Sequence, residues 1–412
     1  MTNSKYVPKR RFKEFVGDGE WVKRELGDVS ISYSGGTPSV GNREYYGDEI
    51  PFIRSAEINS EFTELSLTKI GLEKSSAKMV NIGDILYALY GATSGEVGIS
   101  KIKGAINQAV LCIIPQSEYD SNFIVHWLRF QKENIINTYL QGGQGNLSGS
   151  MVKELEINFP KLSEQRKIGK LFQKLDRLIS GHQHKLDKLK NLKKAYLSEM
   201  FPAEGERVPK RRFPGFEGEW EHKKLGQLMD VGSVKRVHQS DWRDRGVRFL
   251  RARDIVSESK NKKPDDFLYI DEELYKKYSA ISGMVEKGDL LVTGVGTIGV
   301  PMLVESSEPL YFKDGNIIWF KNKNLLDGHF FYYSFTARAI QKFIGDVAGV
   351  GTVGTYTIDS GKNTPIILPV TKEEQVVIGN FFKKLDQSIT LQQQKLDKLN
   401  DLKKAYLNEL FV

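Results

Sequence analysis

The chain carries the stretch EQRKIGKLFQKLDRLISGHQHKLDKLKNLKKAYLSEMF at residues 164–201, and it carries a second copy, EQVVIGNFFKKLDQSITLQQQKLDKLNDLKKAYLNELF, at residues 374–411. More than half of the aligned positions are identical. Apolar residues recur in both copies with a seven-residue period, which is typical of coiled-coil helices. With a rise of ~1.5 Å per residue, each helix would be about 57 Å long. The sequence therefore predicts two long helices related by duplication.

The seven-residue period also predicts which side chains form the contact between helices. Positions 168, 175, 182, 189 and 196 recur in the first copy, and apolar residues fill the two heptad positions that lie three and four residues further on, including Leu171, Leu178 and Leu192. The expected contact residues are Ile168, Phe172, Leu175, Ile179, His182, Leu186, Leu189 and Tyr196 in the first copy, and Ile378, Phe382, Leu385, Ile389, Gln392, Leu396, Leu399 and Tyr406 in the second.

Each long helix has a potential partner in the same chain. Antiparallel pairing of the two copies would place the preceding domains at opposite ends of a rigid spacer, related by a pseudo-two-fold axis. The polar residues His182 and Gln392 would then fix the register at some cost in stability. A seven-residue repeat does not name its partner, so homodimerisation through the same faces is the alternative. We favour the internal pair.

The duplication extends over the whole chain. VPKRRF at residues 7–12 returns at residues 208–213, each time before a Gly- and Glu-rich stretch that ends at Trp21 or Trp220. IPFIRSAEI and GDILYALYGAT in the first half correspond to VRFLRARDI and GDLLVTGVGT in the second, while the sequence between these landmarks diverges. A preserved frame with a divergent interior is expected of two copies of one fold that bind different ligands. Neutral drift of a duplicated scaffold is the alternative.

The segments between the landmarks predict an α+β fold. Residues 21–115 contain many short β-type runs with Gly, Pro and Asn turns, residues 121–140 form an amphipathic helix, and a strand ends at Pro160. The second half repeats this plan with a helix near residues 328–344 and a strand that ends at Pro369. The predicted domains are a first β-rich domain at 1–162, a first spacer helix at 163–203, a second β-rich domain at 204–372 and a second spacer helix at 373–412.

Composition limits where the protein acts. The 412-residue chain has a formal net charge of +8, shared equally between its halves, which is weak support for a polyanionic partner. The single cysteine, Cys112, lies in the apolar run AVLCIIP, so we expect it to be buried and no disulfide to form within the chain. No signal sequence and no apolar run near the roughly 20 residues that span a bilayer are found, so we expect a cytoplasmic protein without a membrane partner.

The sequence contains no recognisable catalytic or metal-binding set. A GxxxxGK[ST] phosphate loop is absent, and GVGTIG at residue 294 does not open a helix in its β-rich setting. The two histidines of HQH at residues 182–184 would point about 200° apart around a helix, so they cannot share a metal. An Asn/Asp-Pro-Pro-aromatic tetrapeptide, which amino-methyltransferases use around a flipped base, is also absent. We therefore expect a non-catalytic chain that binds neither a metal nor a cofactor.

The conserved frame resembles that of type I restriction-modification specificity subunits. The matching motifs are SGGTPS at residues 34–39, IPFIRSAEI, GDILYALYGATSGEVG, GGQGNLS at residues 142–148, FPKLSEQRKI at the start of the first long helix and LPVTKEEQVVI at residue 368. Their order and repetition cover nearly the whole chain. One departure is GSVKRVHQSDW in the second half, where the first half has YSGGTPSVGNREYY, so the second recognition surface is expected to differ in type.

The resemblance implies two target-recognition domains, each of which reads one half of a split site in double-stranded DNA. In this family, two modification subunits clasp the helices and bring S-adenosylmethionine to an adenine in each half-site. Two restriction subunits add translocation and cleavage with ATP and Mg. The cofactors would therefore belong to the partner subunits.

Base edges in the major groove are read by polar side chains on loops, where Arg suits guanine and Asn or Gln suits adenine. Arg251 and Arg253 share one face of an expected strand and are partly structural, and Tyr90 fits a core position better than a stacking one. The candidate DNA-binding residues are Thr37, Arg43, Tyr45, Tyr90, Thr93, Gln141, Gln144 and Asn146 in the first domain, and Lys235, Arg236, Arg243, Arg245, Arg251, Arg253, Thr297, Thr352, Thr355 and Tyr356 in the second.

Charge bears on how tightly the isolated chain could bind DNA. Residues 1–162 contain 18 basic and 19 acidic residues, so this domain alone can neutralise few phosphates. We hypothesise that much of the affinity arises only in an assembled complex. The rival interpretations are a DNA-binding regulator and a coiled-coil scaffold that binds protein only. A neighbouring gene for an adenine methyltransferase would favour the specificity subunit over both.

Overall fold

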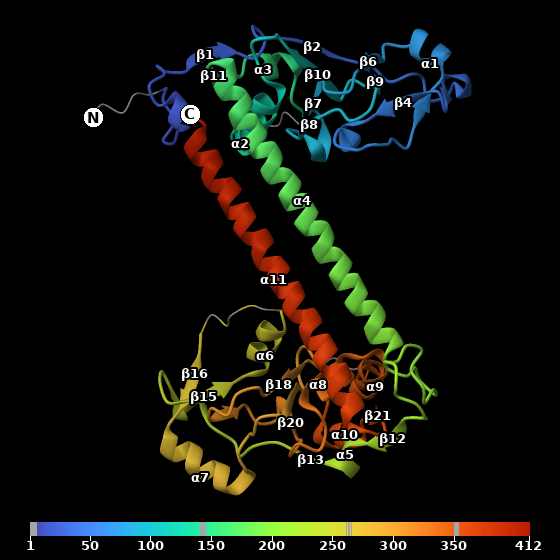
Figure 1. Cartoon of the computed structure of the whole chain (residues 1–412), viewed down its shortest axis with the longest axis vertical. Coiled ribbons are helices and arrows are strands. Elements are labelled where there is room, and N and C mark those ends of the chain that lie inside the picture. The colour runs from blue at the N-terminus through green and yellow to red at the C-terminus, as the bar shows by residue number, and fades with distance from the viewer. Residues whose placement is uncertain (1–5, 141–145, 261, 263, 265, 350–353) are drawn as a thin grey trace. The chain divides into compact units, whose positions relative to one another are not determined.

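The computed structural model describes residues 6–140, 146–260, 262, 264, 266–349 and 354–412, and the chain divides into two compact units (Figure 1). Unit 1 comprises Met1–Gln183 and Gln394–Val412, and unit 2 comprises His184–Gln393. The two long helices are α4 (Leu162–Glu199) and α11 (Lys372–Leu410). Each unit therefore contains one domain, the start of the long helix that follows it and the end of the other long helix.

The domain of unit 1 is built on two sheets. A four-stranded antiparallel sheet has the order β2-β10-β7-β8, and a five-stranded sheet has the order β3-β5-β4-β9-β6 with β4 and β9 parallel. Strands β1 and β11 form a separate antiparallel pair. The strands are β1 (Val22–Glu25), β2 (Ser30–Ser34), β3 (Tyr46–Gly47), β4 (Ile50–Ile53), β5 (Ser66–Leu67), β6 (Lys78–Val80), β7 (Ile85–Ala88), β8 (Val97–Ile99), β9 (Gly104–Ile106), β10 (Val110–Pro115) and β11 (Glu156–Phe159), and the helices are α1 (Lys69–Glu73), α2 (Ser121–Tyr139) and α3 (Gly149–Lys153).

The domain of unit 2 repeats this topology, except that its second sheet has four strands instead of five among the described residues. Its four-stranded sheet has the order β13-β20-β17-β18, its second sheet has the order β14-β16-β15-β19 with β15 and β19 parallel, and β12 pairs with β21. The strands are β12 (Glu221–Lys224), β13 (Asp230–Gly232), β14 (Trp242–Arg243), β15 (Val247–Leu250), β16 (Leu268–Ile270), β17 (Leu290–Thr293), β18 (Pro301–Leu303), β19 (Leu310–Phe312), β20 (Ile317–Lys321) and β21 (Pro365–Leu368), and the helices are α5 (Leu225–Leu228), α6 (Ala252–Ser259), α7 (Glu272–Ser282), α8 (Gly328–Thr336), α9 (Arg338–Ala348) and α10 (Ile358–Asn363). The predicted duplicated α+β fold is confirmed.

The prediction of one helix near residues 328–344 is wrong in detail, because these residues form two helices that meet at Ala337. This residue has an extended backbone, with φ −70° and ψ 152°. The hydroxyls of Ser334 and Thr336 donate to the carbonyls of Phe330 and Tyr333, and such local bonds compete with the helical pattern. In the first half, α2 continues unbroken as predicted.

The four-stranded sheets are covered on both faces, which explains their continuous apolar strands. In β7, Ile85 and Tyr87 pack into the main core of unit 1, and Leu86 packs into a second cluster that contains Cys112. As predicted, Cys112 is a buried free thiol, and burial raises its pKa to about 12. No helix in the described parts of the chain has the length and apolar character needed to cross a lipid bilayer.

The two long helices pair in antiparallel fashion inside each unit. In unit 1, Asp176 of α4 forms an ion pair with Lys403 of α11 at 2.6 Å, and the Phe172 and Phe411 rings stack with centroids 5.5 Å apart. In unit 2 the repeat-related residues pair with the helices exchanged. Asp386 of α11 binds Lys193 of α4 at 2.6 Å, and Phe382 stacks on Phe201.

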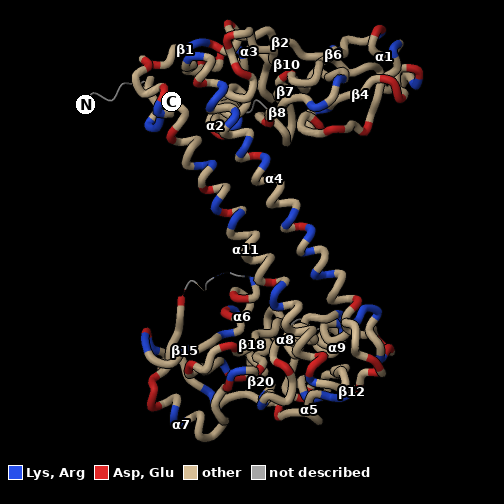
Figure 2. The backbone as a smooth tube through the Cα atoms, viewed as in Figure 1, with Lys and Arg blue, Asp and Glu red and all other residues tan. Residues whose placement is uncertain are grey.

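The sixteen predicted helix-contact residues are all buried or half-buried, and Gln392 is the most enclosed polar residue among them, at 4% exposure. In the neighbouring heptad column, Leu178 and Leu192 instead face outward, with exposures of 41% and 39%. Lys and Arg recur along both helices (Figure 2). The contact between the helices is therefore formed by two adjacent heptad columns. One contains Ile168 and Leu175, and the other contains Phe172 and Leu186.

The VPKRRF repeat fastens both helices in each unit. Arg10 forms an ion pair with Glu409 near the end of α11. Arg11 forms two hydrogen bonds, of 2.8 and 2.7 Å, with Glu164 at the start of α4. The second copy is arranged in the same way, with Arg211 bound to Glu199 and Arg212 bound to Glu374. Two adjacent arginines thus hold the start of one helix beside the end of the other.

The start of each long helix also lies against the helix that precedes it. Gln165 accepts a hydrogen bond from the backbone N–H of Asp120, the N-cap of α2, at 2.9 Å. A Cβ on Gly169 would lie 2.6 Å from the Asp120 carboxylate, so this position requires glycine. Gln375 and Gly379 of α11 meet Asp327 of unit 2 in the same way. The paired EQ-x-x-IG motifs therefore join domain and helix.

A buried histidine is expected to make unit 1 lose stability in mild acid. His126 on α2 is 3% exposed, and its Nδ1 has no hydrogen-bond partner in the described part of the chain. Burial lowers the pKa of His126 from 6.5 to about 4, and nearby Arg129 and Lys403 act in the same direction against Asp176. The unfolded chain therefore binds a proton that the folded chain does not. The free energy of unfolding of unit 1 should therefore fall by up to about 3 kcal/mol as the pH falls from 6.5 to 4.

The second unit supplies a matched variant for this prediction. Tyr333 occupies the equivalent position on α8, and its hydroxyl donates to Asp386 at 2.8 Å. We expect His126→Tyr to reach Asp176 in the same way and to flatten the loss of stability between pH 7 and 4.5, measured by urea unfolding. An unchanged pH dependence in this variant would contradict the assignment to His126.

Candidate nucleic-acid interface

Three loops meet at one edge of each four-stranded sheet. In unit 1, β2 and β7 end where β10 begins, because Ser34 pairs with Leu111 and Ala88 pairs with Val110. In unit 2, β13 and β17 end where β20 begins. The segment before α3 joins this edge through a hydrogen bond of 2.9 Å from the Leu147 N–H to the Leu89 carbonyl, and Tyr356 makes the same bond to Gly294 in unit 2. We call these two places the loop edges.

Four of the eight candidates of the first domain lie at or beside its loop edge. Thr37 follows β2, Tyr90 and Thr93 follow β7, and Asn146 forms a β-bridge with Tyr90. Tyr90 is 37% exposed, so the interpretation of this residue as a core residue is wrong. It leaves the sheet just beyond the last buried position of β7.

Two further candidates of the first domain lie away from these loop contacts. Arg43 and Tyr45 lie in a 3-10 helix between β2 and β3, with Arg43 exposed and Tyr45 half-buried. Gln141 and Gln144 lie outside the described residues. A role of all these residues in DNA binding stays a prediction.

The second domain presents a different set at its loop edge. Lys235 and Arg236 follow β13, Thr297 follows β17, and all three are exposed, as is Thr355 before α10. Tyr356 is 2% exposed and its hydroxyl bonds to Thr364, so in this conformation it supports the loop from inside. Burial also raises the pKa of Tyr356 above that of an ordinary tyrosine. Thr352 lies outside the described residues.

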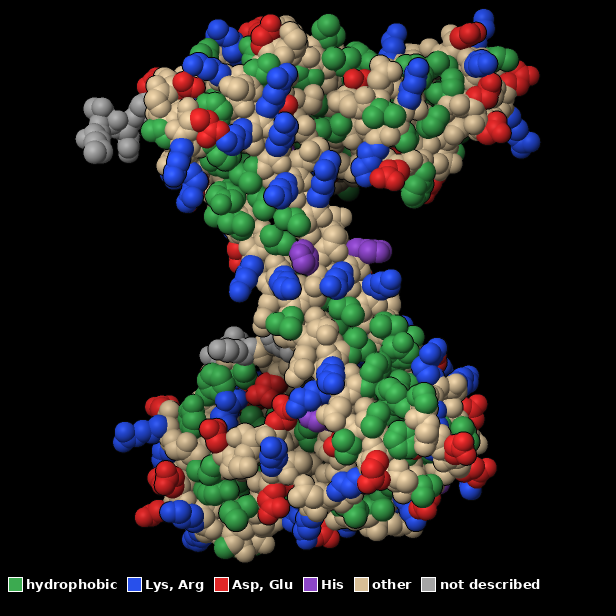
Figure 3. Space-filling model, in the orientation of Figure 1, with side chains coloured by type: hydrophobic (Ala, Val, Ile, Leu, Met, Phe, Trp, Pro, Cys, Tyr) green, Lys and Arg blue, Asp and Glu red, His purple; other side chains and the backbone are tan. Residues whose placement is uncertain are grey.

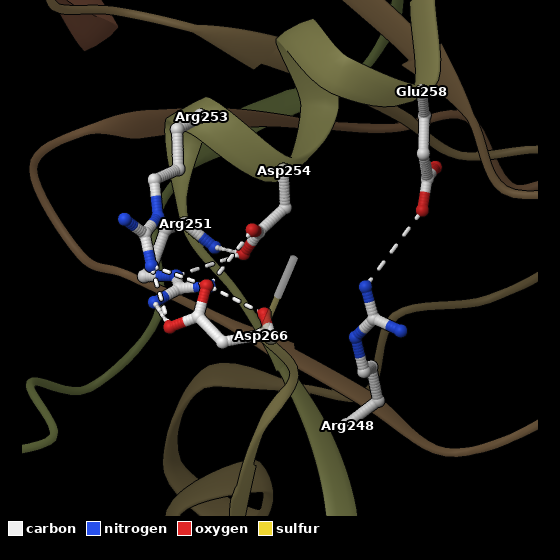
Figure 4. Close-up of polar contacts among 6 residues, drawn as sticks. All are labelled: Arg248, Arg251, Arg253, Asp254, Glu258 and Asp266. Atoms are coloured by element: carbon white, nitrogen blue, oxygen red, sulfur yellow. Dashed lines mark hydrogen bonds and ion pairs between the residues drawn. The ribbon is translucent and has the colours of Figure 1, made fainter. Parts of the chain in front are cut away.

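The segment of residues 242–254 in unit 2 contains five arginines, and three of them, Arg248, Arg251 and Arg253, pair with acidic residues (Figure 4). Arg251 and Arg253 were expected on one strand, but β15 ends at Leu250 and Arg251 is the N-cap of α6. The reason is that Asp254 accepts the Arg251 backbone N–H at 2.8 Å and starts a helix there. The guanidinium of Arg251 also binds Asp254 and Asp266 at 3.0 and 2.9 Å.

The first domain contains the same arrangement, which identifies it as part of the frame. Arg54 is the counterpart of Arg251 in the motif IPFIRSAEI, and it binds Glu57 at 3.0 Å and also Glu64. Because both domains keep this contact while their loop edges differ, the Arg251 contact serves the fold. Hydrogen bonds from Arg251 also lower the pKa of Asp266, which keeps the partner charged.

The remaining arginines of this segment divide into paired and exposed ones. Arg253 is exposed but binds Asp266 at 2.6 Å. Arg248 stacks on Phe267 with 4.1 Å to the ring centroid and lies 3.8 Å from Glu258, a carboxyl whose pKa is raised by burial. Arg243 and Arg245 are exposed before β15. Figure 3 shows basic and acidic side chains interspersed on the visible face of both units.

Two residues at the loop edges were missed by the sequence analysis. Gln108 accepts a hydrogen bond from the Thr37 hydroxyl at 2.7 Å, and Asp314 accepts one from Arg236 Nε at 2.8 Å. Each lies in the turn before a buried strand, β10 or β20. The sequence signal was a polar residue between two apolar strand patterns, which does not by itself show what the residue faces.

Sequence comparison relates the chain to proteins of known type. The family model described as "Type I restriction modification DNA specificity domain" matches residues 18–191 and again residues 217–401. The specificity subunit of the type I restriction enzyme MjaVIII of Methanocaldococcus jannaschii is 22% identical, and the alignment covers 98% of this chain and 96% of the relative. A putative type I restriction enzyme specificity subunit of Haemophilus influenzae is 31% identical over 41% of this chain and 43% of the relative.

A solved structure has the same fold over its full length. The crystal structure of the S subunit of a type I restriction-modification system from M. genitalium superposes with a TM-score of 0.66, covering 98% of this chain and 99% of that chain at 17% sequence identity. The fold of this chain is thus shared with that protein.

Proposed function

This chain belongs to the type I restriction modification DNA specificity family, and on that premise we propose that each of its domains reads one half of a bipartite site in double-stranded DNA. The observation that carries the proposal is the contrast between frame and loop edges. The sheets, the Arg54 and Arg251 contacts and the helix ends are repeated, whereas Thr37 with Gln108 in one domain is replaced by Arg236 with Asp314 in the other. Two domains with the same fold but different exposed side chains at their loop edges suit two different half-sites.

The proposal assigns chemistry to partner subunits. Two modification subunits would supply S-adenosylmethionine and methylate an adenine in each half-site, and two restriction subunits would supply ATP- and Mg-dependent translocation and cleavage. The first long helix would offer these partners a basic surface, since residues 163–199 contain 10 basic and 4 acidic residues. The complex would work in the cytoplasm, where its DNA lies.

Affinity would depend on the assembled complex. Residues 1–162 carry one more acidic than basic residue, and affinity for the phosphate backbone grows with the number of basic contacts. We therefore propose that the modification subunits add positive surface around the DNA. Binding of the isolated chain as tight as that of the complex, at matched salt, would contradict this part of the proposal.

The function is tested by mapping methylated adenines in cells that carry the modification genes with and without this gene. We expect one bipartite motif to be methylated only when the chain is present. Methylation that does not depend on the chain would refute the proposal, and the purified chain alone should transfer no methyl groups. A DNA-binding regulator would change transcription without changing the methylated motif.

A further inference from the structure

A contact between the same two segments recurs in both domains, although its residues differ by one position in the turn. In each, the segment that leaves the first strand of the four-stranded sheet contacts the turn that enters the second strand. Thr37 follows β2 and binds Gln108 before β10, and Arg236 follows β13 and binds Asp314 before β20. Both domains keep a hydrogen bond between these two segments, but a hydroxyl–amide pair in the first domain is replaced by a guanidinium–carboxylate pair in the second.

In the first domain, two glycines let the loop after β2 lie close to its neighbours. A Cβ on Gly35 would overlap the backbone oxygen of Ile106, and a Cβ on Gly36 would overlap the hydroxyl of Ser76. The Gly35 N–H donates to the Asn107 carbonyl at 3.2 Å. Gly35 therefore lets the loop lie directly on the turn, where Thr37 reaches Gln108, and Gly36 lets the loop pass close to Ser76.

Thr37 fixes the orientation of the Gln108 amide. Its hydroxyl donates to Oε1 of Gln108 at 2.7 Å, so the amide oxygen is held on that side and the amide nitrogen on the other. The amide oxygen keeps a second lone pair, and the side chain is exposed. A glutamine in this state can accept from adenine N6 and donate to adenine N7.

Asp314 holds an arginine in the second domain. The side chain of Asp314 is 12% exposed and that of Arg236 is 67% exposed, so the carboxylate lies inside and the guanidinium lies outside. The contact uses Nε of Arg236 at 2.8 Å. Among the described residues, the terminal amino groups of Arg236 make no further hydrogen bond, so they can bind a ligand. The adjoining backbone is fixed, because the Tyr311 hydroxyl donates to the Lys235 carbonyl at 2.8 Å. An arginine with two donors in one plane suits O6 and N7 of guanine.

We propose that Gln108 reads an adenine in one half-site, that Arg236 reads a guanine at the corresponding place of the other half-site, and that Thr37 and Asp314 are positioning residues that hold these readers. The proposal rests on the proposed function and names the specificity residues of that function. Holding a reader before binding reduces the side-chain freedom lost on contact, so each pair should discriminate by about tenfold to hundredfold.

The first test keeps the protein unchanged and alters the DNA. The complex with the modification subunits is titrated against its site with single 7-deazaguanine or 7-deazaadenine substitutions, which remove one N7 acceptor each. We expect a loss of about tenfold in affinity at one guanine of the second half-site and one adenine of the first. The Arg236→Gln complex should lose sensitivity only to that guanine, and the Gln108→Ala complex only to that adenine.

The second test reads the methylated motif in cells. Arg236→Gln and Asp314→Asn should relax or change one position of the second half-site only, and Thr37→Val should relax one position of the first, with recovery in Thr37→Ser. Arg24→Gln on β1 and Lys223→Gln on β12 are the matched controls away from the loop edges and should leave the motif unchanged.

The outcomes separate this inference from the function on which it rests. If Arg236→Gln and Gln108→Ala methylate the original motif with unchanged efficiency, or if their sensitivity to deaza substitution equals that of the unmodified chain, the assignment is overturned. If the unmodified chain directs no methylation at all, the proposed function fails instead. A variant that does not fold is recognised by the loss of both half-sites, and the deaza scan of the unmodified complex then decides.

Discussion

Replacing Arg11 by alanine is expected to lower the free energy of unfolding of unit 1 by about 3–5 kcal/mol, because it leaves a buried carboxylate without its partner. The side chains of Arg11 and Glu164 are only 6% and 1% exposed, and two hydrogen bonds join them. Arg11 also donates to the backbone carbonyls of Asp18 and Gly19. The loss should appear in urea unfolding and in faster hydrogen exchange at the start of α4.

The neighbouring arginine is the control for this prediction. Arg10 pairs with Glu409, but their side chains are 57% and 34% exposed, so water already solvates both charges. Arg10→Ala should therefore cost less than about 1 kcal/mol. Equal effects of the two substitutions would show that burial of the Arg11 pair does not control its contribution. Arg212→Ala should destabilise unit 2 in the same manner, since Glu374 is buried there.

The second expectation concerns the half-chain. A protein of residues 1–206 should form a homodimer, because the end of α4 carries nearly the same residues that the end of α11 contributes to unit 1. Lys193 would replace Lys403 opposite Asp176, Glu199 would replace Glu409 opposite Arg10, and Phe201 would replace Phe411. With the modification subunits, this dimer should direct methylation to a palindromic site made of the first half-site twice.

Sedimentation equilibrium measures the oligomeric state of the half-chain. Lys193→Glu should weaken the dimer by placing two carboxylates opposite each other, and the combined Lys193→Asp, Asp176→Lys variant should restore it with the charges exchanged. His184→Gln, on the same helix but exposed, should have no effect. A monomeric half-chain that retains a folded domain would contradict the internal pairing of the helices.

The helices were predictable because a period is a local property of sequence, whereas the choice between neighbouring heptad columns is not. Seven residues do not fill two turns of an α-helix completely, so apolar residues at both columns satisfy the same pattern. Packing decides that Phe172 is buried while Leu178 is 41% exposed. The break at Ala337 likewise depends on hydrogen bonds that hydrophobic periodicity does not report.

The candidate site was predictable in its location and less so in its members. Loops after β2, β7, β13 and β17 could be identified from turn residues, and Thr37 and Arg236 lie there. The partner of Thr37 is 71 residues away in sequence, and only strand pairing brings Gln108 beside it. The role of Arg251 in the fold could have been predicted from the repeat, since Arg54 and Glu57 have the same spacing in sequence as Arg251 and Asp254.

Each unit is completed by the last turns of the other copy's helix, and this has a consequence for how such genes can change. Recombination within the similar helix segments would replace a whole domain yet deliver the same terminal Glu, Tyr and Phe to the neighbouring unit. A single crossover could therefore give the protein a new target sequence while the contacts between each domain and the end of the other long helix stay unchanged.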